Sequence, residues 1–162
     1  MPVKCTRKFS KKNKKYGLSR LVSTFDYLHK KDKKDYFIEE PNFKLPWNRT
    51  HYKKTWAEVE ETIHEVGSIY TIQGFDLNYV GLILGPSVSY NFEKDELEII
   101  AANYKDSEAF KAREDIPVNQ IEEVKIQIIL NSINVLMKRG IHGLYIYATD
   151  PKLRQKLDSL ND

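Results

Sequence analysis

The sequence has one cysteine and no long apolar run, and each shortage excludes a class of protein. Cys5 is the only cysteine among 162 residues, so no disulfide can form within the chain. The longest apolar runs, such as Val80–Leu84 and Ile128–Leu130, are far shorter than the roughly 20 residues of a membrane-spanning helix. The basic N-terminus is not followed by the apolar block of a secretory signal. We therefore expect a cytoplasmic protein with no membrane partner.

Several common catalytic signatures are also missing. The sequence contains no G-x-x-x-x-G-K-[ST] loop, so this chain alone has no predicted cradle for nucleotide phosphates. A G-x-S-x-G elbow is absent as well, which argues against a serine hydrolase of that type. The four histidines, His29, His51, His64 and His142, stand apart without ligand spacing, so we predict no metal site.

The composition is that of a folded chain. Hydrophobic residues make up 41%, aromatic residues 12% and charged residues 30%, which is enough apolar material for a core. A length near the roughly 150 residues of a typical domain predicts one domain.

Charge divides this chain into two parts. Residues 1–34 carry a net charge of +10 and the remaining 128 residues carry −7, within a total of +3. Residues 1–16 lack apolar periodicity, so we predict a basic flexible arm there and a folded domain over residues 17–162. Lys11, Lys12, Lys14 and Lys15 are the candidate nucleic-acid contacts of the arm, because neutralised phosphates release counterions. A solvated tail without a partner explains the same charge.

The first half of the folded region gives mixed signals. Apolar residues over 18–28 fit a helix capped by Ser19, and a short strand fits almost as well. We predict an extended segment at Tyr36–Glu39 and an aromatic connector at Phe43–Asn48. A short helix capped by Thr55 is predicted over Trp56–His64, and a strand over Gly67–Ile72.

The second half is clearer. Asn78–Gly85 is typical of a strand buried on both faces, and Val88–Asn91 with Glu96–Ile100 predict a hairpin insertion. A long helix ends before Gly140, a buried strand covers Leu144–Ala148, and a last helix begins at Pro151 after its cap Asp150. This order predicts an α/β domain with a mostly parallel sheet flanked by helices and a small hairpin insertion.

Two segments resemble helicase motifs. Thr71–Ile83 (TIQGFDLNYVGLI) resembles motif V of superfamily-one helicases, and Asn131–Ala148, with Lys138-Arg139-Gly140 inside it, looks like motif VI. From about Gly17 through Phe43–Asn48 to Leu157, the chain is similar to the C-terminal part of the bacterial Schlafen group-three-like DNA/RNA helicase family. Lys138 departs from the usual Thr, and Tyr70 and Thr71 from a frequent His and Lys.

The resemblance implies the second RecA-like domain of a two-domain ATP-dependent helicase or NTPase, a P-loop NTPase-type fold that here lacks the P-loop. The first RecA-like domain, with Walker A and B motifs, would be a missing N-terminal partner, and DNA or RNA the other partner. ATP and Mg²⁺ would bind in the context of the full-length protein, so the chain alone is expected to be inactive.

The same resemblance implies roles for individual residues. Arg139 would be an arginine finger that stabilises the transferring phosphoryl group, and we expect it at the edge where the parallel strands finish. Gln73, Gly74, Asp76 and Arg20 would contact or couple to nucleotide, and Thr71 would contact nucleic acid.

Simpler explanations for these residues remain open. A cation at a helix C-terminus explains Arg139 through the helix dipole, and a tight turn explains Gln73-Gly74 and Asp76.

Two rival functions also remain open. One is a non-catalytic nucleic-acid-binding module that uses the basic arm. The other is an interaction domain in which Trp47, Trp56 and nearby aromatic residues pack against a partner.

Overall fold

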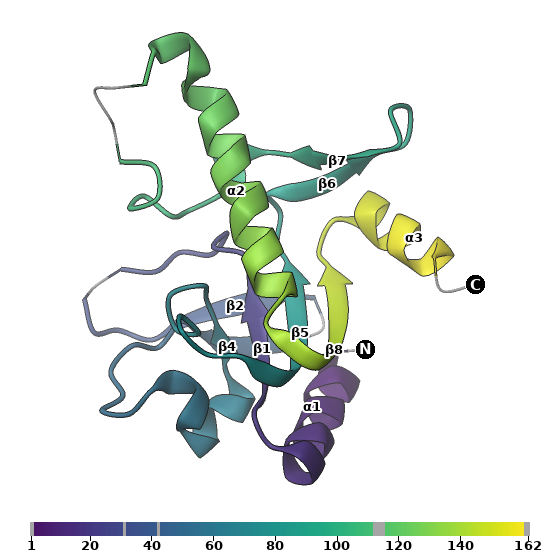
Figure 1. Cartoon of the computed structure of the whole chain (residues 1–162). Coiled ribbons are helices and arrows are strands. Elements are labelled where there is room, and N and C mark those ends of the chain that lie inside the picture. The colour runs from purple at the N-terminus through teal and green to yellow at the C-terminus, as the bar shows by residue number, and fades with distance from the viewer. Residues whose placement is uncertain (1, 31, 42, 112–115, 161–162) are drawn as a thin grey trace.

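The computed structural model describes residues 2–30, 32–41, 43–111 and 116–160. Met1 of the predicted arm and residues 161–162 of the predicted domain lie outside the described residues. A six-stranded sheet in the order β2-β3-β4-β1-β5-β8 forms the centre, and β6 and β7 form a separate hairpin (Figure 1). All neighbouring pairs in the larger sheet are parallel except β2 with β3. The mixed α/β class and the mostly parallel order are confirmed.

Three neighbouring parallel strands form the middle of the sheet and one of its two edges. They are β1 (Ser19–Ser23), β5 (Leu77–Leu84) and β8 (Gly140–Ala148), with Leu21 opposite Gly81 and Gly81 opposite Tyr145. Every residue from Val80 to Gly85 is buried, as predicted for a strand covered on both faces. Because β1 lies within residues 18–28, the strand alternative for that segment is correct. β8 ends the sheet, and no described strand pairs with its outer edge.

The other border is built from short strands. β2 (Tyr36–Glu40) and β3 (Phe43–Trp47) form an antiparallel hairpin, so the predicted aromatic connector is largely a strand. β4 (Val66–Gly67) has two residues, and the strand predicted over Gly67–Ile72 is wrong. The Thr71 hydroxyl accepts from the Ser68 N–H and donates to the Ser68 carbonyl, and Ile72 N–H donates to the same carbonyl. These local bonds close a turn instead of a ladder.

Helix α1 (Pro2–Tyr16) replaces the flexible arm that the sequence predicts over residues 1–16. Phe9 is fully buried and its ring meets Tyr145 edge-on, with centroids 5.5 Å apart. The ring sits over Gly81, where a Cβ atom would lie 2.7 Å from Phe9 Cζ and 2.5 Å from Leu21 Cδ2. One aromatic side chain in a hollow left by a glycine therefore holds the basic segment against the sheet.

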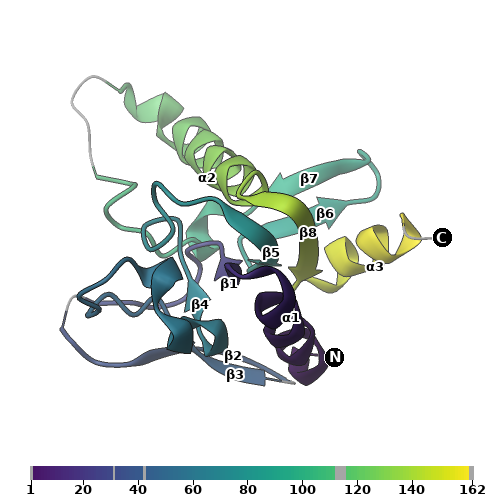
Figure 2. The same cartoon turned by 60° about the horizontal axis from the view of Figure 1, so that its bottom comes forward.

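The helices of the second half agree with their predicted boundaries. α2 (Ile121–Met137) buries Ile129, Ile133 and Leu136, and α3 (Pro151–Ser159) starts with Asp150 accepting from Leu153 N–H at 2.8 Å. In Figure 2, α2 lies above β5 and β8, and α1 lies below them. The hairpin of β6 (Val88–Asn91) and β7 (Glu96–Ile99) extends beside α2 and α3 (Figure 1).

The remaining helical segments are single 3₁₀ turns. The predicted helix over Trp56–His64 is two such turns, η1 (Trp56–Glu58) and η2 (Glu60–His64), and Thr55 makes no side-chain cap bond. η3 (Ala101–Asn103) and η4 (Val118–Gln120) complete the set within the described residues. Among the described helices, none is long and apolar enough to cross a bilayer.

The two tryptophans belong to the core. Trp47 is fully buried and Trp56 is 5% exposed. Trp47 therefore cannot meet a partner at the surface, and the part of the interaction-domain hypothesis that rests on this side chain is wrong.

Candidate functional site

Arg139 and Asp76 meet at one edge of the central sheet. Asp76 precedes β5 and Arg139 precedes β8, and the register pairs the next residues, Leu77 and Gly140. Arg139 Nη1 lies 3.4 Å from Asp76 Oδ1, and the two side chains are 26% and 64% exposed. Leu77 N–H donates to the Arg139 carbonyl at 2.7 Å, which fixes the backbone under the pair. The fold thus brings together two of the residues that the helicase resemblance singles out, 63 positions apart.

The guanidinium of Arg139 is incompletely satisfied. Its Nε is buried and has no hydrogen-bond partner, and its contact with Asp76 is a long one. Asp76 is largely in solvent, where an ion pair contributes roughly 0 to 1 kcal/mol. Arg139 is therefore held only weakly by Asp76 and keeps one buried N–H group without an acceptor.

The expectation that Arg139 lies at the edge where the parallel strands finish is wrong. β5 and β8 run parallel, and Arg139 lies where both strands begin rather than where they finish. The reason is the connection, because α2 returns across the sheet and delivers the chain to the starting edge. A partner that uses Arg139 must therefore face this starting edge.

The segment between β4 and β5 holds the other residues of the first motif. Gly74 has φ +79°, a left-handed conformation that favours glycine, and Gln73 beside it is exposed. Thr71 differs, since its hydroxyl already donates to and accepts from the Ser68 backbone. The structure therefore leaves Gln73 free to meet a ligand and commits the Thr71 hydroxyl to the turn.

A hollow of about 380 Å³ lies beside this turn. It is lined by residues of the turn and of the segment that follows β3: Arg49, Thr50, Tyr52, Lys54, Thr55, Trp56, Tyr70, Thr71 and Gln73. Thr71 and Gln73 thus come together at a surface with cationic, hydroxyl and aromatic groups.

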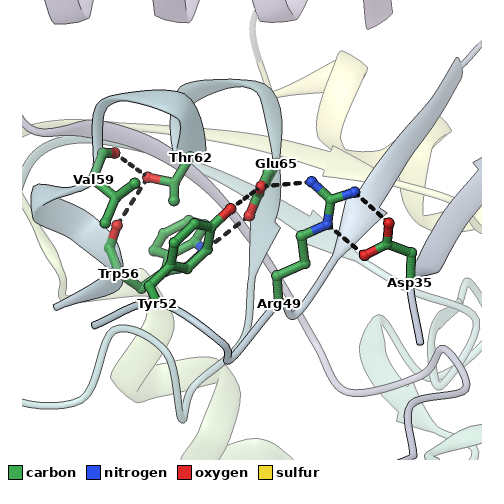
Figure 3. A network of polar contacts seen from close by, with 7 residues as sticks. All are labelled: Asp35, Arg49, Tyr52, Trp56, Val59, Thr62 and Glu65. Carbon is green, nitrogen blue, oxygen red and sulfur yellow. Dashed lines mark hydrogen bonds and ion pairs between the residues drawn. The ribbon is translucent and has the colours of Figure 1, made fainter. Parts of the chain in front are cut away.

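A polar network forms the wall of this hollow (Figure 3). Glu65 is 2% exposed and accepts from Arg49 Nη1 at 3.0 Å, from Trp56 Nε1 at 3.2 Å and from the Tyr52 hydroxyl. Arg49 also donates from Nε and Nη2 to both oxygens of Asp35, each at 2.8 Å. This bidentate pair and the buried carboxylate hold the wall rigid.

The network also perturbs its titratable groups. Burial and the hydrogen bond to Glu65 raise the pKa of Tyr52 to about 12. The carboxylates of Asp35 and Glu65 raise the pKa of Arg49 further above its usual value. Sequence reasoning missed this network because its members are far apart along the chain and match no motif.

Arg20 is a structural residue. It is 3% exposed, and its five N–H groups make five hydrogen bonds. The acceptors are Thr62 Oγ1, Asn13 Oδ1 and the carbonyls of Ser19, Ala57 and Val59, at 2.7 to 3.0 Å. The predicted nucleotide contact of Arg20 is therefore wrong, since the side chain has no N–H group left to offer.

The lysines of α1 differ in their surroundings. Lys12 Nζ lies 4.1 Å from the centroid of the Tyr79 ring, a cation–π contact that ties the helix to β5. Lys11, Lys14 and Lys15 are exposed on the helix surface, and Lys15 lies over the Tyr16 ring. The helix thus presents three of the four candidate lysines to solvent.

Asp26 marks the opposite edge, where β1 and β5 finish. It is 4% exposed, and its Oδ2 accepts from Thr24 Oγ1 and Ser87 N–H, both at 3.0 Å, while Oδ1 is buried without a partner. Burial raises the pKa of this carboxyl above its usual value. The sequence offers no signal for this residue. Across the described residues, no group of three or more His, Cys, Asp or Glu side chains is placed to hold a metal ion.

Comparison with known proteins places the chain in a family. Residues 2–150 match the family described as Schlafen group 3, DNA/RNA helicase domain. The Saccharomyces cerevisiae protein YPL245W is 46% identical over 149 residues, which is 90% of this chain and 32% of that protein. The chain therefore spans about a third of the length of this relative, and the expected resemblance to a bacterial group includes a yeast protein. No solved structure matches significantly. Since the family match covers most of its length, the chain belongs to the Schlafen group 3, DNA/RNA helicase domain family.

Proposed function

We propose that this chain is the second RecA-like half of an ATP-dependent DNA or RNA helicase or related NTPase. In this proposal, Arg139 donates its guanidinium to the phosphate of ATP that a separate Walker-type domain binds. The family match and the resemblance of residues 71–83 and 131–148 to helicase motifs support this function.

One observation carries the proposal: Arg139 and Asp76 converge at the start of two adjacent strands with the guanidinium incompletely paired. A guanidinium has permanent charge and fixed donors, which suit it to an oxygen that gains negative charge. A cation that merely completed the C-terminus of α2 would not need Asp76 beside it or an unpaired Nε. The proposal therefore treats the contact with Asp76 as the resting position of the side chain.

The proposal assigns the described residues to one side of an ATP site. Arg139 would meet the phosphates, and Gln73, Gly74 and Asp76 lie on the same turn and edge, but the chain has no phosphate-binding loop. When bound by the other domain, ATP and Mg²⁺ supply the phosphoryl group and its charge neutralisation. This chain supplies permanent positive charge, and the proposal gives it no activity alone.

The test is Arg139→Ala in the full-length protein in which this domain occurs. ATP turnover is expected to fall by about 10³-fold or more, the range for loss of an arginine finger, while ATP affinity stays unchanged. Turnover is measured by phosphate release and affinity by equilibrium binding.

Lys152→Ala, an exposed cation at the start of α3, serves as the matched control and should keep full turnover. Turnover of Arg139→Ala equal to that control would remove the finger assignment.

The exposed lysines of α1 favour a second candidate function. Lys11, Lys14 and Lys15 sit on an ordered helix, so a non-catalytic module that binds nucleic acid through α1 fits the same chain. This function requires no other domain and no ATP, which separates it from the motor in a binding assay with the chain alone.

A further inference from the structure

The hollow beside the turn continues into a second one. The second has a volume of about 670 Å³ and lies where β1 and β3 finish. Its lining comes from four segments: Phe25, His29, Lys30, Asn48, Thr50, Tyr70, Lys105, Asp106, Ser107 and Glu108. Thr50 and Tyr70 line both hollows, so the two adjoin at Tyr70, and we refer to them together as the groove.

Tyr70 is exposed and yet held in place. Tyr70 is 47% exposed, and its ring packs edge-on against Phe25 with centroids 5.8 Å apart. The hydroxyl donates to Asp106 Oδ2 at 2.6 Å, and Asp106 Oδ1 accepts from the N–H groups of Glu108 and Ala109. A buried carboxylate fixed by two backbone donors thus anchors the ring between the two hollows. Because the ring is already ordered, a ligand that binds it loses little additional side-chain entropy.

Three lysines line the two hollows. Lys54 lines the first hollow, and Lys30 and Lys105 line the second; among the described residues, none of the three makes an ion pair. Of the two carboxylates in the lining, Asp106 accepts the hydrogen bonds above and Glu108 pairs with Lys111 at 2.7 Å. Arg49 is neutralised by Asp35 and Glu65, so the lysines supply the accessible positive charge.

We propose that this groove binds a single-stranded nucleic acid, with Tyr70 as the ring on which one base stacks and the lysines beside it as phosphate contacts. The proposal rests on the proposed nucleic-acid role and names a residue for it. An anchored, half-exposed aromatic ring between two hollows that each carry at least one exposed lysine suits successive nucleotides of one strand, because every unpaired base has a face to stack. A duplex hides these faces, and a peptide has no regular negative charge.

The experiment measures binding of the purified chain to a short fluorescein-labelled oligothymidylate and to its oligouridylate counterpart by anisotropy, without ATP. Tyr70→Ala is expected to weaken binding about 5- to 150-fold, which corresponds to the 1 to 3 kcal/mol of one stacked base. Tyr70→Phe keeps the ring and should lose less than Tyr70→Ala. Lys105→Ala leaves the contacts of the Tyr70 ring with Phe25 and Asp106 in place, and it should weaken binding and lower the salt dependence of the affinity.

Phe92→Ala is the matched control, since Phe92 is 50% exposed and lies in the β6–β7 hairpin away from the groove. Equal affinities for Tyr70→Ala and Phe92→Ala, with Lys105→Ala also unchanged, would overturn the proposal, as would absence of binding by the wild type. A double-stranded competitor as effective as the single strand would overturn it too.

The result is independent of the motor assignment. Loss of binding in Tyr70→Ala with normal ATP turnover by an Arg139→Ala protein would support the groove and reject the finger. The opposite pair of results would reject the groove and keep the finger.

Discussion

Arg20 and Asp26 show two ways in which one strand and its end bury a charge. Arg20 in β1 uses all five donors on neutral oxygens, namely Thr62 Oγ1, Asn13 Oδ1 and the carbonyls of Ser19, Ala57 and Val59. Asp26, just past the same strand, keeps one carboxylate oxygen without a partner. A buried polar group with all its hydrogen bonds stabilises the fold, and a buried polar atom without a partner costs free energy. Substitutions of Arg20 and of Asp26 should therefore have opposite effects on stability.

Replacing Arg20 with Lys should lower the free energy of unfolding by about 2 kcal/mol or more. An ammonium has three donors and cannot reach the five acceptors, so buried carbonyls lose partners. Urea unfolding measures the loss. Lys14→Ala on the exposed side of α1 is the comparison and should change stability by less than about 0.5 kcal/mol. An equal, small effect of both would show that Arg20 is not structural.

Asp26→Asn should change how stability depends on pH. The pKa of Asp26 is raised in the folded state, so the folded chain retains this proton to a higher pH than the unfolded chain does. Stability from this group is therefore full below the unfolded pKa, near roughly pH 4, and is lost as pH rises through the folded pKa.

The variant lacks this titration, so its stability relative to wild type should improve steadily from acid toward neutral pH. Urea unfolding at a series of pH values measures the difference. A difference that stays constant, or that moves against the variant as pH rises, would show that burial does not raise the pKa of Asp26.

At the scale of elements, α1 is the clearest departure from expectation. Its sequence has few apolar residues, and nothing in residues 1–16 shows that one ring will find a hollow over Gly81. The hollow exists only once β1, β5 and β8 have assembled, so no local pattern predicts it.

Phe9→Ala tests whether this single ring holds α1. Removal of a fully buried Phe typically costs about 3 to 5 kcal/mol, and a loss in this range is expected by urea unfolding. Lys11→Ala, two residues along the same helix and exposed, should be nearly neutral. A neutral Phe9→Ala would return residues 1–16 to the flexible arm that the sequence predicts.

The predictable elements share a physical reason. β5 and β8 are apolar runs, α2 has a long apolar periodicity ended near Gly140, and α3 has its Asp-Pro cap. Each signal is complete within its own segment. β4 and the turn after it failed because the Ser68–Thr71 bonds outweigh the β-propensity of Ile69, Tyr70 and Ile72.

The candidate site divides in the same way. The motif resemblance singled out Arg139 and Asp76, and the fold brings them together. It also selected Arg20, whose role is decided by carbonyls of η1 and η2 that no pattern near Arg20 shows. The anchor of Tyr70 on Asp106 spans 36 positions and was likewise invisible.

For the whole molecule, the turn after β4 connects the two candidate regions. Tyr70 lines the groove, and Asp76 pairs with Arg139 at the edge where β5 begins. Tyr70, the proposed base contact, thus lies six positions before Asp76, the partner of the proposed phosphate contact Arg139. The basic helix α1 is a further cationic surface, with its own test.

Replacing Lys11, Lys14 and Lys15 together with Gln tests the binding-module function. If all three contact phosphates of a single strand, the slope of log affinity against log salt should shrink by roughly 2. The measurement is oligonucleotide binding by the chain alone over a range of salt. An unchanged slope would exclude α1 as the main nucleic-acid surface.

The bare outer side of β8 has a consequence for handling the isolated domain. Its backbone donors and acceptors face outward with no strand beside them among the described residues, and Ile141 is 63% exposed on the same strand. Such a border invites another copy to add its own strand, which leads to stacking and precipitation as concentration rises. A lysine in place of Ile141 should act as a gatekeeper and keep the preparation monodisperse.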